Sequence, residues 1–423
     1  MIRITKFFIR NSNSTRIKID KSVVQSNKRQ KRGVIVDQRY SKVFKPGTFP
    51  DITYVSRKSG TMQYSYEERL QQSLSIDGFL TYIVGPSKIG KTVLCERVIG
   101  VDRIVAMSGN DFVRESDFWN RIGKKVGISM DAEISETNAD FSSNEQRSTM
   151  IRKNYPANKE KILSYFKEYD KVLVLDDFHY APVDVQYDIA CQLKEVIRLG
   201  FKAVIISLPY RSDDAIRLNP DLTGRLSVIE IEPWKEEELQ AIARKGFHEL
   251  GVPVQEDIIS RMAMESIHSP QVMQAICLNI GLLPVETADI NESVIEESCR
   301  FTCANLPYAD VVRILKAGPP TRGQKRLKYK LPDGSQRDVY SLILKMLADN
   351  PPLVEMTLEE LMNRIQLNVP DQKITTQKIR EALRNWQKLL DELGALYRVF
   401  EWKDDIIHIL DNLFLFFIRW SGI

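Results

Sequence analysis

The sequence is poor in the residues that build metal centres and disulfide frameworks. Its 423 residues include only four histidines and five cysteines, and no two cysteines stand at the spacing of a zinc ribbon or a redox motif. Only Cys299 and Cys303 lie near one another, one helical turn apart. We interpret these two as packing residues, and we expect a protein of the reducing cytosol, that is, a cytoplasmic one.

Long apolar runs are also missing. The longest run near the C-terminus, NLFLFFIRW, is far shorter than the roughly 20 residues that a membrane helix needs. The N-terminal segment mixes charges into its apolar stretch and has no small-residue cleavage site, so it does not resemble a signal peptide. We therefore predict no membrane span and no membrane partner.

No large excess of one charge is present, since the net charge is +4. The charges are nevertheless unevenly distributed. Basic residues gather in RIKIDKSVVQSNKRQKRG and KRLKYKLPDGSQR, whereas EDIISRMAME and NESVIEESCR are acidic. This pattern allows contact with an anionic partner such as DNA but does not require one.

The sequence does contain five short apolar runs separated by helical stretches. The runs lie at residues 79–84, 103–107, 171–177, 202–208 and 226–232. Strands that alternate with helices predict an α/β fold with a parallel sheet covered on both faces. The polar stretch 129–159, which has no periodicity, is expected to be a mobile loop between two of these units.

The pattern changes after Pro233, where strand signals stop and apolar residues take helical spacing. Near the C-terminus, three helical patterns precede two strand-like pieces, which is the order of a winged helix. The predicted organisation is a basic N-terminal arm outside the core (1–50), a core (51–232), a helical lid (233–310), a basic linker (311–336) and a winged-helix domain (337–423).

The first apolar run leads into the stretch GPSKIGKT, which fits the phosphate-loop pattern G-x-x-x-x-G-K-[ST]. Its glycines allow consecutive N–H groups to point inward, its lysine reaches the terminal phosphates, and its threonine offers a hydroxyl to Mg²⁺. The alternative, a glycine-rich turn, does not explain the lysine and the threonine. The predicted nucleotide-binding residues are Gly85, Pro86, Ser87, Lys88, Ile89, Gly90, Lys91 and Thr92.

A second motif, VLVLDDFHY, ends a buried strand in two aspartates. Asp176 lies at the carboxyl edge of the predicted sheet, beside the phosphate loop, where with Thr92 it can hold Mg²⁺. Asp177 is then free to orient the attacking water. The alternative is a helix cap, and the phosphate loop favours the catalytic interpretation.

Together these motifs resemble the P-loop ATPases of the AAA+ and STAND groups over most of the chain. The resemblance implies a P-loop NTPase core with a helical lid and a C-terminal winged helix, using ATP and Mg²⁺. Asp177 stands where AAA+ members usually have glutamate, as in many STAND members, and this departure favours slow hydrolysis. The resemblance further assigns Ser207 and Arg211 to the γ-phosphate sensor and Arg225 to an arginine finger. The alternative for each arginine is a solvated charge at a helix end.

The resemblance also extends to the lid and the C-terminal domain. In SIHSPQVMQAIC, Pro270 takes the place of the STAND proline that packs on adenine. Gln271 stands where many AAA+ proteins carry a lid arginine, which favours the STAND side. His408 lies near a position where some STAND proteins have a phosphate-touching histidine, although a histidine in an apolar strand is more often packed or hydrogen-bonded to the backbone.

Three functions remain open. The first is a slowly hydrolysing switch that oligomerises with ATP and controls a separate effector protein, as STAND proteins of prokaryotic signalling or defence do. The second is a DNA-transaction ATPase of the initiator or transposition type. The third is a nucleotide-binding scaffold that does not hydrolyse ATP. The expected recognition helix mixes Lys378, Arg380, Arg384 and Lys388 with acidic residues, which is weak evidence for DNA.

Overall fold

The computed structural model describes most of the chain beyond the first 37 residues. The described residues are 38–60, 62–112, 118–128, 156–208, 216, 219, 222, 224–283, 290–321, 323, 325–370, 372–393 and 399–422.

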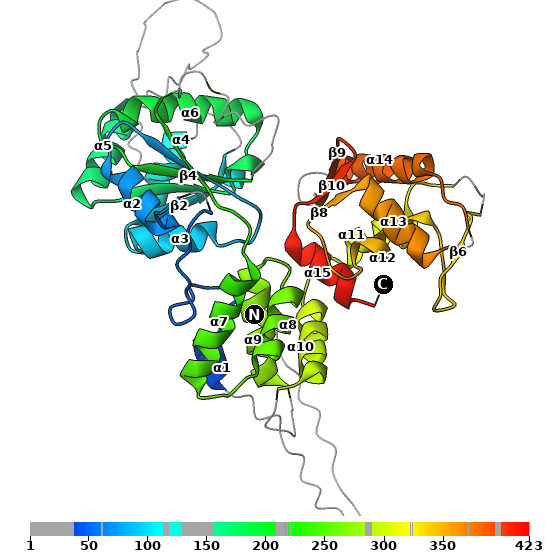
Figure 1. Ribbon diagram of the computed structural model, residues 1–423. Helices are drawn as coiled ribbons and strands as arrows, with labels where there is room; N and C mark the ends of the chain where they lie inside the picture. Colours follow the sequence, from blue (N-terminus) through cyan, green and yellow to red (C-terminus); the bar gives the residue numbers. More distant parts are fainter. Residues whose placement is uncertain are drawn as a thin grey trace, which may run out of the picture.

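A five-stranded parallel sheet forms the centre of the N-terminal half (Figure 1). Its strand order is β2-β3-β4-β1-β5, and every neighbouring pair is parallel. The strands are β1 (Leu80–Val84), β2 (Ile104–Ser108), β3 (Val172–Asp176), β4 (Ala203–Ser207) and β5 (Leu226–Glu230). All five fall within or next to the predicted apolar runs, so the prediction of an α/β fold with a parallel sheet is confirmed.

Helices cover both faces of the sheet, which explains why its strands read as continuous apolar runs. One face packs on α2 (Tyr66–Ser75) and α3 (Lys91–Ile99), and the other on α4 (Phe118–Lys125), α5 (Pro156–Glu168) and α6 (Val183–Ile197). Helix α5 begins inside the stretch that was expected to be a mobile loop. Most of that stretch, 129–155, lies outside the described residues.

Four helices after β5 form a compact bundle, the lid: α7 (Glu236–Leu250), α8 (Glu256–Glu265), α9 (Pro270–Leu282) and α10 (Glu292–Ala304). A short N-terminal helix, α1 (Gln38–Val43), packs against α7 and α9. Phe44 directly after it is fully buried, with its ring centroid 5.2 Å from that of Phe247. The expectation of an arm outside the core is therefore wrong for residues 38–50, because their aromatic side chains complete the lid core. Residues 1–37 lie outside the described residues.

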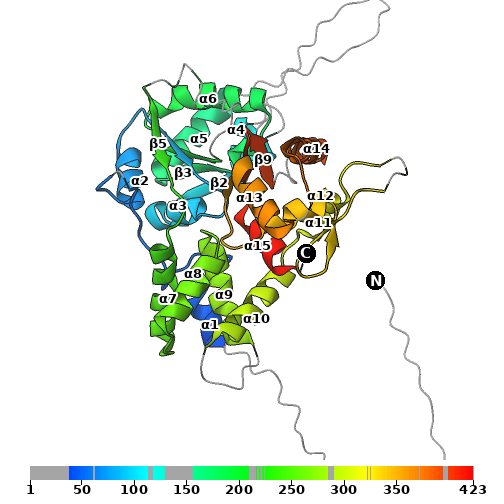
Figure 2. The same ribbon diagram turned by 45° about the vertical axis from the view of Figure 1, so that its right-hand side comes forward.

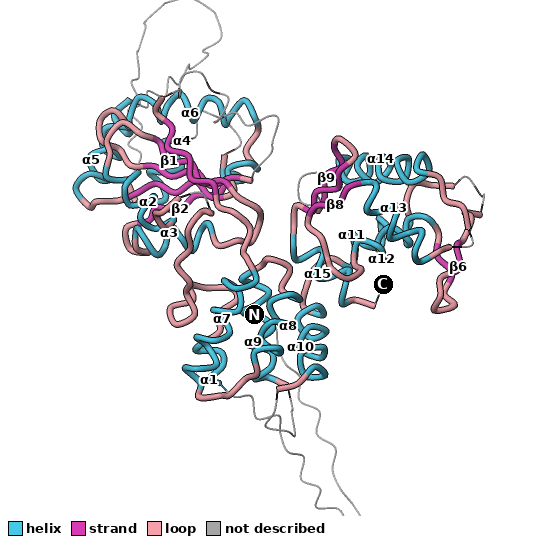
Figure 3. The backbone as a smooth tube through the Cα atoms, viewed as in Figure 1, coloured by secondary structure: helices cyan, strands magenta, loops and turns pink. Residues whose placement is uncertain are grey.

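The C-terminal unit combines helices with a small antiparallel sheet, β8-β10-β9. Its elements in chain order are α11 (Ala309–Ala317), β6 (Tyr329–Lys330), β7 (Gln336–Arg337), α12 (Val339–Leu347), β8 (Glu355–Thr357), α13 (Leu358–Asn368), α14 (Thr376–Leu393), β9 (Phe400–Lys403), β10 (Ile406–Ile409) and α15 (Asn412–Trp420). The expected helices α12, α13 and α14 and the expected strands β9 and β10 are all present. Strand β8 (Figure 3), which pairs with β10, was not expected from the sequence.

The stretch expected to be a linker, 311–336, contains regular structure at both of its ends. Helix α11 occupies its first residues and packs against α12. The indole Nε1 of Trp386 in α14 donates a hydrogen bond of 2.8 Å to the carbonyl of Leu315 in α11. Near its end the chain forms the β6–β7 hairpin (Tyr329–Lys330 and Gln336–Arg337). The amphipathic pattern of α11 was hidden in the sequence by the prolines, glycines and charges that follow it.

The lid and the C-terminal unit are joined through helix α15, which packs on α10. The carboxylate of Glu265 at the end of α8 is fully buried and accepts hydrogen bonds from Arg419 at 2.6 and 2.8 Å. It also accepts one from the Trp420 indole at 3.1 Å and pairs with Arg261 at 2.9 Å. Four donors thus compensate for the burial of one carboxylate.

Helix α15 is also the longest apolar run that the sequence offers. Among the described residues, no helix is both long enough and apolar enough to cross a membrane.

Candidate functional site

The stretch GPSKIGKT forms the loop between the end of β1 and the start of α3, as the sequence predicts. Gly90 has φ of +96° at the N-cap of α3, a conformation that L side chains rarely adopt. A Cβ at Gly85 would lie 2.5 Å from Cδ1 of Ile89 and 2.8 Å from the Ile231 carbonyl, so only glycine fits there. These two glycines wrap the loop around the first turn of α3.

Lys91 is the buried cation of this loop. Its Nζ donates hydrogen bonds to the carbonyls of Gly85 at 2.8 Å and Pro86 at 2.7 Å. Burial lowers the pKa of Lys91 to about 8, although the nearby carboxylates of Asp177 and Asp176 act in the opposite direction. A buried ammonium group with only partial compensation favours binding of an anion at this position.

Thr92 and Asp176 meet beside Lys91. The Thr92 hydroxyl donates a hydrogen bond to Asp176, with 2.6 Å between Oγ1 and Oδ2. One cation could contact both oxygens, and oxygen ligands are those that Mg²⁺ prefers. Among the described residues, no group of three or more His, Cys, Asp or Glu side chains could hold a metal. Mg²⁺ takes few protein ligands and keeps water and phosphate oxygens, so two protein oxygens are sufficient to hold it.

Asp177 adopts the left-handed conformation, with φ of 48° and ψ of 39°. Its backbone N–H donates a hydrogen bond of 2.9 Å to Oδ1 of Asp176. Burial and the neighbouring negative charge of Asp176 raise the pKa of Asp177 above its ordinary value. A carboxylate whose pKa is raised is a better proton acceptor near neutral pH.

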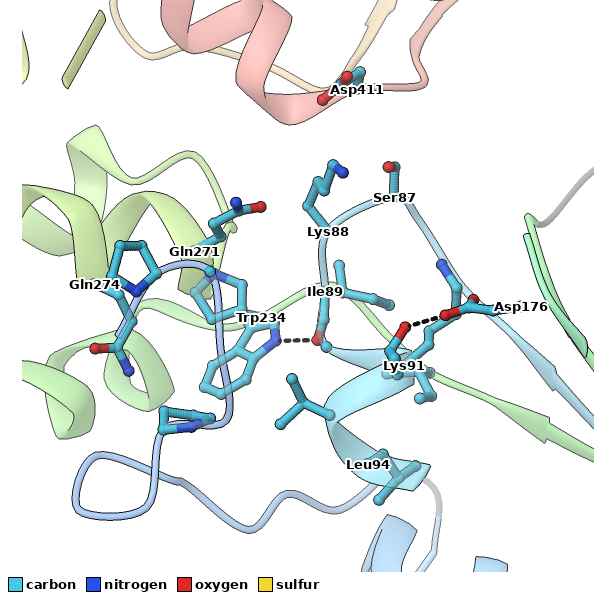
Figure 4. A pocket seen from close by; sticks show the side chains of 18 of the residues that line it. Ser87, Lys88, Ile89, Lys91, Leu94, Asp176, Trp234, Gln271, Gln274 and Asp411 are labelled. Atoms are coloured by element: carbon cyan, nitrogen blue, oxygen red, sulfur yellow. Dashed lines mark hydrogen bonds between the residues drawn. The ribbon is translucent and has the colours of Figure 1, made fainter. Parts of the chain in front are cut away.

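The loop opens into a cavity of about 570 Å³, within the usual size range of small-molecule sites. Its walls come from three parts of the chain: the core, including the phosphate loop, Asp176 and Asp177; the lid, with Pro270 and Gln271; and the C-terminal unit, with Asp411. Figure 4 shows Asp411 on the far side of the cavity from the loop that carries Ser87 and Lys88.

The N-terminal segment forms one wall of the same cavity. Residues 45–48, together with Thr53 and Tyr54, are among those that line it. Gln274 of α9 fixes this segment to the lid, because its Nε2 donates to Thr53 Oγ1 at 2.6 Å and its Oε1 accepts from the Lys45 N–H at 3.1 Å. This contact is a second reason why residues 38–50 do not form a separate arm.

Trp234 connects the lid to the phosphate loop. Its indole Nε1 donates a hydrogen bond of 2.9 Å to the Ile89 carbonyl (Figure 4). The Arg57 guanidinium lies 4.4 Å from the Trp234 ring centroid and pairs with Glu238 of α7 at 2.9 Å. The segment between β5 and α7 therefore contacts the loop that would hold phosphate.

The remaining predicted residues occupy different positions. Ser207 is the last residue of β4, in register with Val84 directly before the phosphate loop, and it is buried. Arg225 directly precedes β5 and so lies at the opposite edge of the sheet. Arg211 lies outside the described residues. His408 is not among the lining residues and pairs instead with Glu355 of β8 at 3.2 Å.

Several lining residues were not anticipated from the sequence, among them Asp411, Tyr308 and Trp234. The Tyr308 hydroxyl donates a hydrogen bond of 2.5 Å to Asp411 Oδ2. Burial, reinforced by Asp411, raises the pKa of Tyr308, so its proton stays in place. The only signal in the sequence was the position of Asp411 directly before an apolar run, which predicts a helix N-cap and nothing about a cavity.

No family model and no curated protein sequence matches the chain. Solved structures with a similar fold include the Walker-type ATPase paby2304 of Pyrococcus abyssi, with 14% identity, a TM-score of 0.46, and 84% of this chain and 94% of that chain covered. Cdc6p of Pyrobaculum aerophilum has 14% identity, a TM-score of 0.43 and coverage of 90% and 98%. The RuvB Holliday junction branch migration motor of Thermotoga maritima has 13% identity, a TM-score of 0.35 and coverage of 81% and 86%.

Proposed function

We propose that the protein is a P-loop ATPase of the AAA+/STAND type that binds ATP with Mg²⁺ and hydrolyses it slowly. One observation carries the proposal: a buried lysine and a Thr92–Asp176 pair lie at one end of a cavity large enough for a nucleotide. A structural turn would not need a buried ammonium group whose pKa is lowered. A phosphate loop does, because the ligand supplies the missing negative charge.

In the proposed site the chain's own residues divide the work. Loop N–H groups and Lys91 bind the phosphates, and Pro270 contacts the base. Thr92 and Asp176 would hold Mg²⁺, which neutralises charge on the phosphate oxygens when bound. Asp177 orients water and accepts its proton, while Ser207, at the end of the strand beside the loop, contacts the γ-phosphate. Arg211 is kept as a second γ-phosphate sensor on the ground of resemblance alone.

Arg225 supports a homo-oligomer. Its Nη1 is buried, and within the described part of the chain it has no hydrogen-bond partner. A five-residue strand separates it from the edge that carries the phosphate loop, roughly 16 Å away. If Arg225 acts as an arginine finger, it must therefore act on the nucleotide of a neighbouring subunit, and ATP binding would then promote assembly.

The position of the cavity supports a switch. Residues of the core, the lid and the C-terminal unit all line the cavity, so a nucleotide there contacts all three units. The number of phosphates on the nucleotide can therefore alter the relative positions of the units. In this proposal the assembled ATP state controls a separate effector protein. The residues in line with STAND proteins, Asp177 and Gln271, support this form of output.

A DNA-transaction ATPase is the second candidate. The observation that favours it is the β6–β7 hairpin of the C-terminal unit, where exposed lysines gather. Measurement of molecular size with and without ATP, and again with duplex DNA, separates the two: a switch assembles with ATP alone, whereas the second candidate forms a complex that contains DNA.

Thermal unfolding tests the nucleotide site itself. A ligand at about 100 times its Kd adds roughly 2.7 kcal/mol to a folded protein that binds it. We expect ATP with Mg²⁺ to raise the unfolding temperature of the wild type and of Lys124→Ala, which changes an exposed lysine of α4. Lys91→Ala should lose the shift. An equal shift in Lys91→Ala would refute the site.

A further inference from the structure

The β6–β7 hairpin and its flanks concentrate positive charge. Between Lys316 and Lys345 the acidic side chains of the described residues are Asp333 and Asp338 alone. The basic side chains in the same stretch are Lys316, Lys325, Arg326, Lys328, Lys330, Arg337 and Lys345. The excess is thus local, although the chain as a whole is nearly neutral.

Both acids of this stretch are already paired. Asp333 accepts from Lys345 at 2.7 Å, and Asp338 pairs with Arg326 at 3.3 Å. Within the described part of the chain, the side chains of Lys325, Lys328 and Lys330 are exposed and form no hydrogen bond or ion pair. These three lysines, which we call the hairpin lysines, remain available to an external anion.

Burial of Tyr329 sets the direction of the two lysines on either side of it. Tyr329 is buried, so its neighbours Lys328 and Lys330 point the opposite way, toward solvent. Residues two apart on a strand lie about 6.6 Å from one another on the same side. Each strand of duplex DNA presents a phosphate about every 3.4 Å along its axis, so neighbouring lysine tips can contact different phosphates.

A hydrogen bond ties this surface to the start of α14. The Nζ of Lys378 donates to the Tyr329 hydroxyl at 2.8 Å and lies 5.3 Å from the centre of its ring. Lys373, three residues before the start of α14, is also exposed. The first turn of α14 and the hairpin therefore form one surface, whereas Asp391 and Glu392 lie at the other end of that helix.

The hairpin also borders a groove of about 1040 Å³, which Lys325, Lys328 and Arg337 help to line. Arg337 lies near a second cation, Lys316. The pKa of Lys316 is lowered mainly by its burial and secondarily by the positive charge of Arg337.

The surface lies away from the nucleotide cavity. In both Figure 1 and Figure 2 the hairpin stands on the side of the C-terminal unit that faces away from the core. Asp411, which lines the cavity, belongs to the same unit but not to the hairpin surface. A partner on the hairpin would leave the cavity open to nucleotide.

From this we infer that the hairpin lysines, with Lys373 in the segment before α14, bind the phosphate backbone of duplex DNA. The inference rests on the second candidate function, a DNA-transaction ATPase, and identifies the surface that would bind the DNA. Duplex DNA fits better than an acidic peptide, because the three lysines are close in sequence, are all exposed, and can each contact a separate phosphate of a regular polyanion.

The test is fluorescence anisotropy of a labelled 25-base-pair duplex at several salt concentrations. We compare wild type with the triple variant Lys325→Gln, Lys328→Gln and Lys330→Gln. The matched control removes the same charge from exposed lysines of α4 and α5, through Lys124→Gln, Lys125→Gln and Lys167→Gln. We expect the hairpin variant to bind at least tenfold more weakly at 100 mM salt, and the control to bind like the wild type.

Salt dependence gives an independent measure. Each lost phosphate contact lowers the slope of log K against log salt by about 0.9, so three lost contacts lower it by about 2.7. Equal weakening in the hairpin and control variants would overturn the inference, as would a wild type that binds polyglutamate of equal charge but not the duplex. The ATP-induced thermal shift of the same three proteins is read in parallel. Its loss in the wild type would refute the nucleotide site and leave the DNA result standing.

Discussion

The hydroxyl of Thr92 and the carboxylate of Asp176 are joined by a hydrogen bond of 2.6 Å, although they belong to α3 and β3. We expect Thr92→Val, which keeps the shape and removes the hydroxyl, to weaken ATP binding about tenfold in the presence of Mg²⁺, or ~1.4 kcal/mol. Thr92→Ser keeps the hydroxyl and serves as the control. Calorimetric titration at low and high Mg²⁺ measures the difference, and equal affinities for the two variants would exclude Thr92 as a metal ligand.

Asp177 should decide hydrolysis rather than binding. Asp177→Asn retains a hydrogen-bonding side chain but cannot accept a proton, so we expect ATP hydrolysis to fall by about 10²–10⁴ while the ATP-induced thermal shift persists. Because the pKa of Asp177 is raised, the wild-type rate should decline on the acid side at a higher pH than for an ordinary aspartate. A variant that hydrolyses ATP at the wild-type rate would transfer the role to another residue.

The lowered pKa of Lys91 predicts that nucleotide binding takes up a proton at alkaline pH. Below pH 8 the lysine is charged in both the free and the bound protein, so no proton uptake is expected at pH 7. Above pH 8 the free protein loses this proton, whereas bound phosphate restores it, so affinity should fall by up to tenfold per pH unit. Calorimetry in two buffers of different ionisation enthalpy detects the uptake. Identical enthalpies at pH 8.5 would contradict the prediction.

Asp411 places a negative charge across the cavity from the phosphate loop. Asp411→Asn keeps the N-cap of α15, because asparagine caps helices as well as aspartate does. Loss of the repulsion should tighten ATP binding by roughly 1 kcal/mol and ADP binding by less, since ADP carries less charge. Glu355→Gln removes a carboxylate of the same unit outside the cavity and should change neither affinity. An unchanged ratio of ATP to ADP affinity in Asp411→Asn would rule out this effect.

The packing of the N-terminal segment predicts a large loss of stability from one aromatic residue. Phe44→Ala should lower the free energy of unfolding by about 3–5 kcal/mol, because Phe44 is fully buried against Phe247. Lys42→Ala on the exposed side of α1 should change it by less than about 0.5 kcal/mol. Urea denaturation measures both, and similar values for the two variants would show that the segment does not contribute to the lid core.

The sequence predicts well those features that short segments encode. The five strands and the phosphate loop follow from local apolar runs and from eight consecutive residues, and Asp176 follows from the end of one strand. The cavity does not follow, because Asp411 is separated by more than 300 residues from the loop it faces. The N-terminal segment was mistaken for an arm because nearby basic residues dominate its composition, whereas Tyr40 and Phe44 decide its packing.

The hairpin is a second feature that the sequence predicts only in part. The charge of KRLKYK is plain in the sequence, but which lysines are free is not. Pairing of Asp333 with Lys345 and of Asp338 with Arg326 depends on where α12 begins. The alternation that turns Tyr329 inward depends on the contact with Lys378 in α14.

The buried carboxylate of Glu265 limits the places at which the units of the chain can move relative to one another. Three units in series could bend at two places, but separating the lid from α15 would leave this carboxylate in the interior without the guanidinium of Arg419. We therefore expect the lid and the C-terminal unit to move together as one body relative to the core. The segment between β5 and α7 connects this body to the core. Because Trp234 in this segment is hydrogen-bonded to the phosphate loop, a movement of the segment would act directly on the loop.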